Sequence, residues 1–311
     1  MRTINFKKFL TYDYYLRKEV AFLKRIGSEN AIFAEARRRY YWTTGKKLDY
    51  RHPKDISEKL MWLTRYDRNP LKTQCADKYL VRDYVQKKGL GNLLIPLLGV
   101  WDHASDIDFS TLPDKFVLKC NHGSGWNVIC TDKETLDIDD TRKKLDTWLG
   151  MTYGVDLQEV HYFDIPPKIV CEEFMPVLGD DVVDYKFHCS RGKVHSCFVA
   201  YDRSPVNPHQ GCYDHYDIDW NRTDDIKEEF RPNRRLLPKP QRYEDMLKIA
   251  STLSEDFNYV RVDLYNCGDK IFFGELTFTP YSGIQTFYRQ SMLDELGRFV
   301  SLKGVKKKRY R

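Results

Sequence analysis

The sequence predicts an α+β fold in which helices alternate with antiparallel β-hairpins. Two observations carry this prediction. Residues 184–200 and 259–278 each contain two runs rich in β-branched and aromatic residues around a short glycine-containing turn, as in a β-hairpin. Between them lie segments such as 243–257, in which apolar residues recur at helical spacing.

Length and composition limit the class of protein. A chain of 311 residues with 41% hydrophobic and 14% aromatic residues can bury one large core or two ordinary ones. Its 51 basic residues exceed the 45 acidic ones by six, the number of basic residues in the tail, 303–311. The rest of the chain is balanced in charge, which argues against a nucleic-acid partner. We expect the tail to be solvated or to contact anionic membranes weakly.

Cysteine usage and the first residues predict a cytoplasmic location. Eight scattered cysteines without a C-x-x-C motif are typical of a reducing compartment. The N-terminus lacks the apolar core of a signal peptide, and no run approaches the ~18 apolar residues of a membrane span. His209, Cys212 and His215 have the spacing of a soft-metal site, but no fourth ligand is apparent, so a polar loop is favoured.

In chain order, the predicted elements begin with helices. Helical spacing runs from residue 4 to 48, and Asp55 or Ser57 can cap a helix that ends at Leu63. A helix over 76–89 ends at a glycine, and an apolar strand over 93–100 follows it. The remaining predicted elements are strands 116–120, 128–130 and 168–175, a helix over 141–149, the hairpin 184–200, a loop over 201–239, and the helix 243–257.

The last hairpin, 259–278, carries charged residues on one face. If Cys267–Asp269 forms a three-residue loop, Asp263 lies opposite Phe273 and Arg261 lies opposite Glu275. Asp263 and Glu275 are then diagonal neighbours on one face of the sheet.

Two carboxylates placed in this way can hold one Mg²⁺, which prefers one or two protein carboxylates together with phosphate oxygens. Thr277 can add an oxygen, and Arg261 can face phosphate charge. The alternative is a half-buried hairpin with an ordinary exposed Arg–Glu pair.

Two further segments suggest a nucleotide. Lys119 precedes a short loop containing Gly123, Ser124 and Gly125, in which glycines let backbone N–H groups approach phosphate while the lysine supplies charge. The loop matches neither G-x-x-x-x-G-K-[ST] nor G-x-G-x-x-G, and an ordinary turn remains the alternative.

The strand that ends in Glu172, Glu173 and Phe174 offers backbone groups and a carboxylate to an adenine edge, or simply turns to solvent. Lys186 and Arg203 are additional cations that can meet phosphate oxygens or lie on the surface.

The order of these features resembles the ATP-grasp fold. From about residue 53 to 302 the chain is similar to the TupA-like ATP-grasp family of teichuronopeptide biosynthesis. The resemblance rests on several motifs that agree in order and type: Ala76–Tyr79, Leu112–Gly125, Cys171–Phe174, Asp184–Phe187, Tyr201–Arg203, Asp219–Trp220, Arg261–Tyr265 and Gly274–Pro280.

The resemblance implies roles for the candidate residues. Lys119 would hold the α- and β-phosphates, and Gly123, Ser124 and Gly125 would close over them. The residues implied around adenine are Glu172, Glu173 and Phe174, with Asp180 or Asp181 at the ribose. Those implied around the γ-phosphate are Lys186, Arg203 and Arg261, with Mg²⁺ on Asp263 and Glu275. Thr277 stands where the wider fold usually has Asn.

The resemblance also implies a domain division and a function. Residues 1–52 would be a helical region, 53–110 a lead-in, 111–302 the ATP-grasp domain with subdomains 111–175 and 176–302, and 303–311 the basic tail. An ATP-dependent ligase would join a carboxylate of a surface polysaccharide, or of its precursor, to an amine. A glycosyltransferase of the same pathway and a non-catalytic nucleotide-binding module are the alternatives.

Overall fold

The computed structural model describes residues 29–154, 159–175, 183–202, 211–230 and 235–307. They form helices and two antiparallel sheets, which confirms the predicted α+β class. The α-helices of the described residues are α2 (Glu29–Thr44), α3 (Ile56–Tyr66), α4 (Leu71–Ala76), α5 (Val81–Lys87), α6 (Ile138–Leu149), α7 (Tyr243–Ser254) and α8 (Gln290–Phe299). The strands are β1 (Leu97–Trp101), β2 (Phe116–Cys120), β3 (Asn127–Cys130), β4 (Ile169–Glu173), β5 (Asp184–Ser190), β6 (Lys193–Tyr201), β7 (Cys212–Asp217), β8 (Val260–Cys267) and β9 (Lys270–Thr277).

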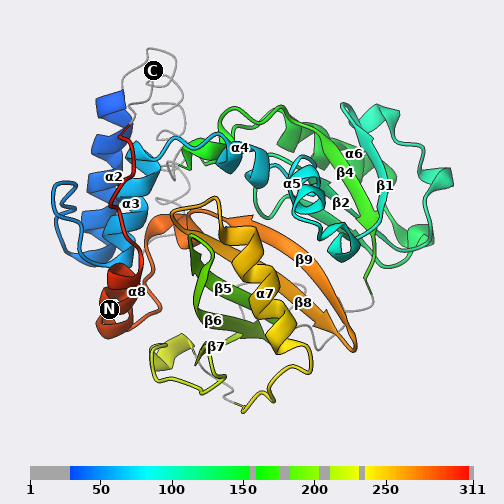
Figure 1. Cartoon of the computed structure of the whole chain (residues 1–311). Helices are drawn as coiled ribbons and strands as arrows, with labels where there is room; N and C mark the ends of the chain where they lie inside the picture. The colour runs from blue at the N-terminus through cyan, green and yellow to red at the C-terminus, as the bar shows by residue number, and fades with distance from the viewer. Residues whose placement is uncertain (1–28, 155–158, 176–182, 203–210, 231–234, 308–311) are drawn as a thin grey trace.

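The smaller sheet has the strand order β1-β4-β2-β3 and its own core. Phe116, Leu118, Ile169 and Cys171 are fully buried because they alternate along β2 and β4 on the face that α6 covers. Leu145 of α6 belongs to the same core. Figure 1 shows this sheet with α5 and α6 at the upper right.

The larger sheet has the order β7-β6-β5-β8-β9 and is covered on one face by α7 (Figure 1). Met246, Ala250 and Leu253 lie at helical spacing along α7 and are fully buried against the sheet. On the sheet side, Val260, Val262 and Leu264 share this core. The alternation along β8 leaves Arg261 and Asp263 on the opposite face.

A third core joins α2, α3 and α8, which Figure 1 shows gathered at the left. Asp55 caps α3 by accepting the Glu58 N–H at 2.9 Å, as the sequence predicted. The part of the predicted 4–48 helix that the structure describes is helical from residue 29 to residue 44. No helix among the described residues is long and apolar enough to cross a membrane.

The prediction of one helix over 76–89 was wrong. Helix α4 stops at Ala76 because the Asp77 carboxylate accepts the N–H groups of Tyr79 and Leu80, at 2.7 and 3.2 Å. The Lys78 N–H instead donates to the Asn121 carbonyl at the end of β2. The break therefore ties this segment to the smaller sheet.

Two other predicted boundaries also need correction. The strand predicted over 93–100 begins only at Leu97, because residues 91–93 form a 3-10 turn and Pro96 precedes the strand. The loop predicted over 201–239 contains β7. Its sequence is polar because the inward residues are satisfied by polar partners: Asp214 accepts from the Tyr201 hydroxyl at 2.9 Å.

Candidate active site

The turn between β8 and β9 sets the geometry of the candidate metal residues. Cys267 pairs with Lys270, so the turn contains two residues, Gly268 and Asp269, instead of the predicted three. Gly268 has φ +58, a value that glycine adopts without strain. The prediction of a three-residue loop was therefore wrong.

A bulge at Gly274 changes the register again. Leu264 pairs with Phe273, but Asp263 pairs with Glu275, which leaves Gly274 as the extra residue. A Cβ atom at Gly274 would lie 2.9 Å from the Asp263 carbonyl oxygen, so the bulge requires glycine. Asp263 thus lies directly opposite Glu275, and the predicted Asp263–Phe273 pairing was wrong.

Arg261 holds the oxygens of this hairpin together. It lies opposite Thr277, not opposite Glu275 as predicted. The Arg261 guanidinium donates to both Asp263 oxygens at 2.7 Å, to Glu275 Oε1 at 3.0 Å and to Thr277 Oγ1 at 3.1 Å. Burial would lower the pKa of Arg261, but the charges of Asp263 and Glu275 outweigh it and raise the pKa.

Lys186 of β5 joins the same group from the neighbouring strand. Its Nζ lies 2.6 Å from Asp263 Oδ2 and 3.1 Å from Asp184 Oδ2. Burial alone would lower the pKa of Lys186, but the charges of Asp184 and Asp263 outweigh it and raise the pKa. The lysine therefore remains a cation in a largely buried position.

The smaller sheet contributes a second ionic group. Lys119 Nζ lies 2.6 Å from Glu172 Oε2, and Arg82 Nη1 of α5 lies 3.2 Å from Glu172 Oε1. The Glu172 side chain is largely buried, and both of its oxygens bind cations. Strands β2 and β4 are adjacent in the sheet, which places Lys119 beside Glu172.

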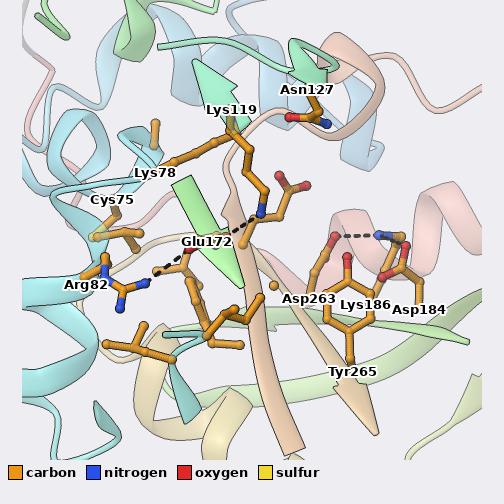
Figure 2. A pocket seen from close by; sticks show the side chains of 18 of the residues that line it. Cys75, Lys78, Arg82, Lys119, Asn127, Glu172, Asp184, Lys186, Asp263 and Tyr265 are labelled. Carbon is orange, nitrogen blue, oxygen red and sulfur yellow. Dashed lines mark hydrogen bonds and ion pairs between the residues drawn. The ribbon is translucent and has the colours of Figure 1, made fainter. Parts of the chain in front are cut away.

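Residues of both groups line one cavity of about 230 Å³, here called the inter-sheet cavity, although Arg261 and Thr277 are not among its lining residues. Five of the predicted residues line it: Lys119, Glu172, Lys186, Asp263 and Glu275. Figure 2 shows Lys119 and Glu172 on one side of the cavity and the Lys186–Asp263 pair on the other. Residues far apart in the sequence therefore meet where a polyanion could contact cations from both sheets.

Other predicted residues take different positions. Ser124 and Gly125 are exposed on the loop between β2 and β3, and Glu173 is exposed at the end of β4. Phe174 is half-buried and is not among the lining residues. Asp180, Asp181, Arg203 and His209 lie outside the described residues.

Sequence reasoning missed Lys78 as a site residue. Lys78 lines the inter-sheet cavity, and its ammonium donates to the Gly123 carbonyl oxygen in the β2–β3 loop. Burial lowers the pKa of Lys78, and the charge of Glu275 opposes this effect. The motif Ala76–Tyr79 already contained Lys78, but its assignment to a continuous helix gave no reason to place the Lys78 side chain in a binding site.

Three more lining residues carry polar groups that the prediction did not include. Arg82 and Asp184 form the ion pairs described above, and Tyr265 of β8 pairs with Asp184 across the cavity from Arg82. Asp184 stood two residues before Lys186 in a predicted strand, so strand alternation placed both side chains on one face. That spacing was a usable signal.

The donor set fits a hard divalent cation. Asp263, Glu275 and Thr277 present only oxygen atoms, and their convergence on the Arg261 guanidinium shows that these oxygens lie within a few ångströms of one another. Among the described residues there is no group of three or more His, Cys, Asp or Glu side chains suited to a metal. Two carboxylates with added phosphate oxygens match the manner in which Mg²⁺ is usually bound.

A family model described as TupA-like ATPgrasp matches residues 58–301. The chain belongs to the TupA-like ATP-grasp family. The match covers both sheets and the inter-sheet cavity of this ATP-grasp protein, and it excludes α2. No curated protein matches the chain significantly.

Solved structures similar to this ATP-grasp protein include D-alanine–D-alanine ligases. The Bacillus anthracis enzyme has 15% identity and a TM-score of 0.42, over 74% of this chain and 68% of that one. The Helicobacter pylori enzyme has 15% identity and a TM-score of 0.42, over 78% and 68%. An L-amino acid ligase from Bacillus licheniformis has 17% identity and a TM-score of 0.39, over 71% and 44%.

Proposed function

We propose that this protein is an ATP-dependent ligase that joins a carboxylate to an amine through an acyl phosphate. The observation that carries the proposal is the inter-sheet cavity, in which Lys119 faces the Lys186–Asp263 pair and Glu275. Membership of the TupA-like ATP-grasp family supports ATP as the substrate that supplies the phosphate.

The reaction has two balanced steps. An oxygen of the acid attacks the γ-phosphorus of ATP, and ADP leaves with the electrons of the broken P–O bond. The amine nitrogen then attacks the acyl carbon, phosphate leaves, and the amine gives up a proton to solvent. Neither step needs a nucleophile from the protein, so the side chains act by positioning and by charge.

Different cations of the site would contact different phosphates of ATP. Lys119 and Lys78 line the inter-sheet cavity and would hold the inner phosphates. Lys186, which also lines it, and Arg261, which donates to Asp263, would stabilise charge on the transferred group. Asp263, Glu275 and Thr277 would hold Mg²⁺, which neutralises phosphate charge when bound. Lys119 and Lys186 would exchange their carboxylate partners, Glu172 and Asp263, for phosphate oxygens as ATP enters.

We further propose that the acid belongs to an acidic cell-surface polysaccharide or to its precursor, and that the protein acts in the cytoplasm. The resemblance of the motifs to the teichuronopeptide-biosynthesis family supports this substrate class. The sugar acid would enter as a single carboxylate and leave as an amide. The amine is an amino acid or an amino sugar.

The test is formation of ADP and of a trapped intermediate. The protein is incubated with ATP, Mg²⁺, and glucuronate or polyglutamate, with hydroxylamine in place of the natural amine. Hydroxylamine converts an acyl phosphate to a hydroxamate, so the proposal predicts ADP and hydroxamate in equal amounts. Turnover of a UDP-sugar without ATP would support the glycosyltransferase instead, and ATP binding without ADP from any acid would support the binding module.

A further inference from the structure

A second cavity lies beside the inter-sheet cavity, with α4 contributing to both. It has a volume of about 640 Å³, within the ~300–1,000 Å³ that is usual for small-molecule sites. Cys75 and Ala76 of α4 line the inter-sheet cavity, whereas Lys72, Thr73 and Gln74 line the second one. Residues 160–162 divide in the same way: Tyr162 lines the first cavity, and Val160 and His161 line the second.

His161 presents an unused imidazole to this second cavity. The residue is only 7% exposed, and its ring packs against Tyr162 and Phe278 with centroids 4.6 and 5.5 Å away. Neither ring nitrogen has a hydrogen-bond partner among the residues that the structure describes. Burial first, and the charge of Lys72 second, lower the pKa of His161 to about 3, so the ring is neutral. A neutral imidazole keeps one N–H donor, from which a ligand in the cavity can accept a hydrogen bond.

Lys72 supplies a second donor close to His161. It is 7% exposed, and its Nζ contacts Asp67 Oδ2 at 2.8 Å and the Asp67 carbonyl at 3.3 Å. An ammonium has three N–H donors, and the third has no acceptor among the described residues. The Asn258 amide donates to the same oxygen, Asp67 Oδ2, at 2.9 Å.

The second cavity is lined by both cations and carboxylates. Arg68 and Lys72 are its cations, and one of its two carboxylates, Asp67, is bound to Lys72. Asp164 also lines the cavity but is exposed, so solvent and salt screen its charge. An ammonium ligand would meet Arg68 and Lys72 directly and be repelled by them.

We propose that this second cavity binds a small organic acid, whose carboxylate accepts hydrogen bonds from His161 and Lys72 and whose apolar part lies on Leu63, Val160 and Phe278. Leu63 and Phe278 are buried and Val160 is half-buried, so they form an apolar floor beside the two donors. The site is separate from the ATP site and does not depend on the proposed ligase activity.

The site is placed to sense or influence the inter-sheet cavity. Thr279 lines the second cavity and donates to Glu159, which lies three residues before Tyr162, a residue that lines the first cavity. Thr279 follows the end of β9 by two residues, so it is covalently close to Glu275 and Thr277. Occupancy by an acid would stiffen a wall that both cavities share.

The experiment uses the full chain and four probes: butyrate, benzoate, butylamine and benzylamine. Saturation-transfer NMR and thermal shifts report binding, each with and without a saturating non-hydrolysable ATP analogue and Mg²⁺. The two acids are expected to bind in both conditions, and the two amines are expected not to bind. Displacement of the acids by the nucleotide would place them in the inter-sheet cavity and overturn the proposal, as would binding of the amines or no binding of the acids up to about 20 mM.

The matched variants are His161→Phe and His103→Phe. Phenylalanine keeps the ring contacts of His161 with Tyr162 and Phe278, and His103 is an exposed histidine outside both cavities. Loss of a hydrogen bond to a charged ligand weakens binding of the acids by about tenfold in His161→Phe and leaves it unchanged in His103→Phe. Equal affinity of wild type and His161→Phe would overturn the proposal. The comparison of acids with amines on the wild-type protein tests the proposal even if a variant folds poorly.

Discussion

Asp263 and Glu275 contact the same guanidinium but differ in exposure. Substitutions at the two positions should therefore differ in their effect on stability. The Asp263 side chain is 2% exposed and binds both Lys186 and Arg261, whereas the Glu275 side chain is 46% exposed. Removing one partner of a buried ion pair costs ~3–5 kcal/mol, while an exposed pair contributes at most about 1 kcal/mol.

Glu275→Gln is therefore expected to abolish most Mg²⁺-dependent ATP turnover, by at least about a hundredfold, with a nearly unchanged melting temperature. Asp263→Asn is expected to lose turnover and to melt several degrees lower, because two buried cations lose their shared carboxylate. ADP release and calorimetry on both variants check this. Full turnover in Glu275→Gln would rule out a metal role for that carboxylate.

His161 also gives a pH dependence with a defined sign. Its pKa in the folded protein is about 3, below the ordinary histidine value of 6.5, so below pH 6.5 the unfolded chain takes up a proton that the folded chain does not. The stability that this residue contributes is present above pH 6.5 and is lost as the pH falls toward 3. Between pH 6.5 and 4.5 the loss amounts to about 2 kcal/mol.

His161→Phe removes this titration, so its free energy of unfolding should fall less steeply than that of wild type over the same range. Urea unfolding at several pH values measures the difference. Parallel curves for the two proteins would mean that His161 is protonated in the folded state.

At the scale of elements, the β8–β9 hairpin depends on Gly274. Alanine at this position would place Cβ 2.9 Å from the Asp263 carbonyl oxygen, and the backbone would have to move. We expect Gly274→Ala to cost ~1–3 kcal/mol and to reduce ATP turnover strongly, because the bulge is what sets Asp263 opposite Glu275.

The matched control for this hairpin is Gly268→Asn. Gly268 has φ +58 with no atom within 4 Å of an added Cβ, and asparagine tolerates this conformation better than other residues do. The control should keep both stability and turnover. Retention of full activity in Gly274→Ala would show that the carboxylate pairing does not need the bulge.

The hairpins were predictable from sequence because alternation and glycine turns act locally. The register of β8–β9 was not, since a bulge depends on the backbone contacts of Gly274 with Asp263 and Tyr265. Strand β7 was missed because its polar residues are buried with partners, such as Tyr201 for Asp214. The helix predicted over 76–89 broke because Asp77 bonds its own backbone.

The candidate site was likewise predictable only where local sequence patterns mark its residues. Lys119, Glu172, Lys186, Asp263 and Glu275 stood out because each lies in a recognisable strand or loop, and the structure brings them into one cavity. Lys78 and Arg82 did not stand out, because they reach the cavity only after α4 and α5 pack against the sheets. Contacts between distant segments carry no periodic signal in the sequence.

At the scale of the whole molecule, ATP would bridge two sheets that have separate cores. A ligand at a hundred times its dissociation constant adds about 2.7 kcal/mol to the free energy of unfolding. We expect ATP with Mg²⁺ to slow amide hydrogen exchange in β2 and β4 as well as in β8 and β9. Protection confined to one sheet would contradict a site shared by both.

The lysines of the inter-sheet cavity are already ion-paired, so a nucleotide that binds them must replace their carboxylate partners. Lys119 and Lys186 already hold carboxylates, at 2.6 Å each, so a bare triphosphate would release Glu172 and Asp263 without giving them new partners. A triphosphate that carries a divalent ion would bind Lys119 and Lys186 through its oxygens, and the ion would replace the lost positive charge beside Asp263 and Glu275. Chelation of free magnesium should therefore weaken nucleotide affinity itself, and the protein would select the magnesium-bound nucleotide before any chemistry begins.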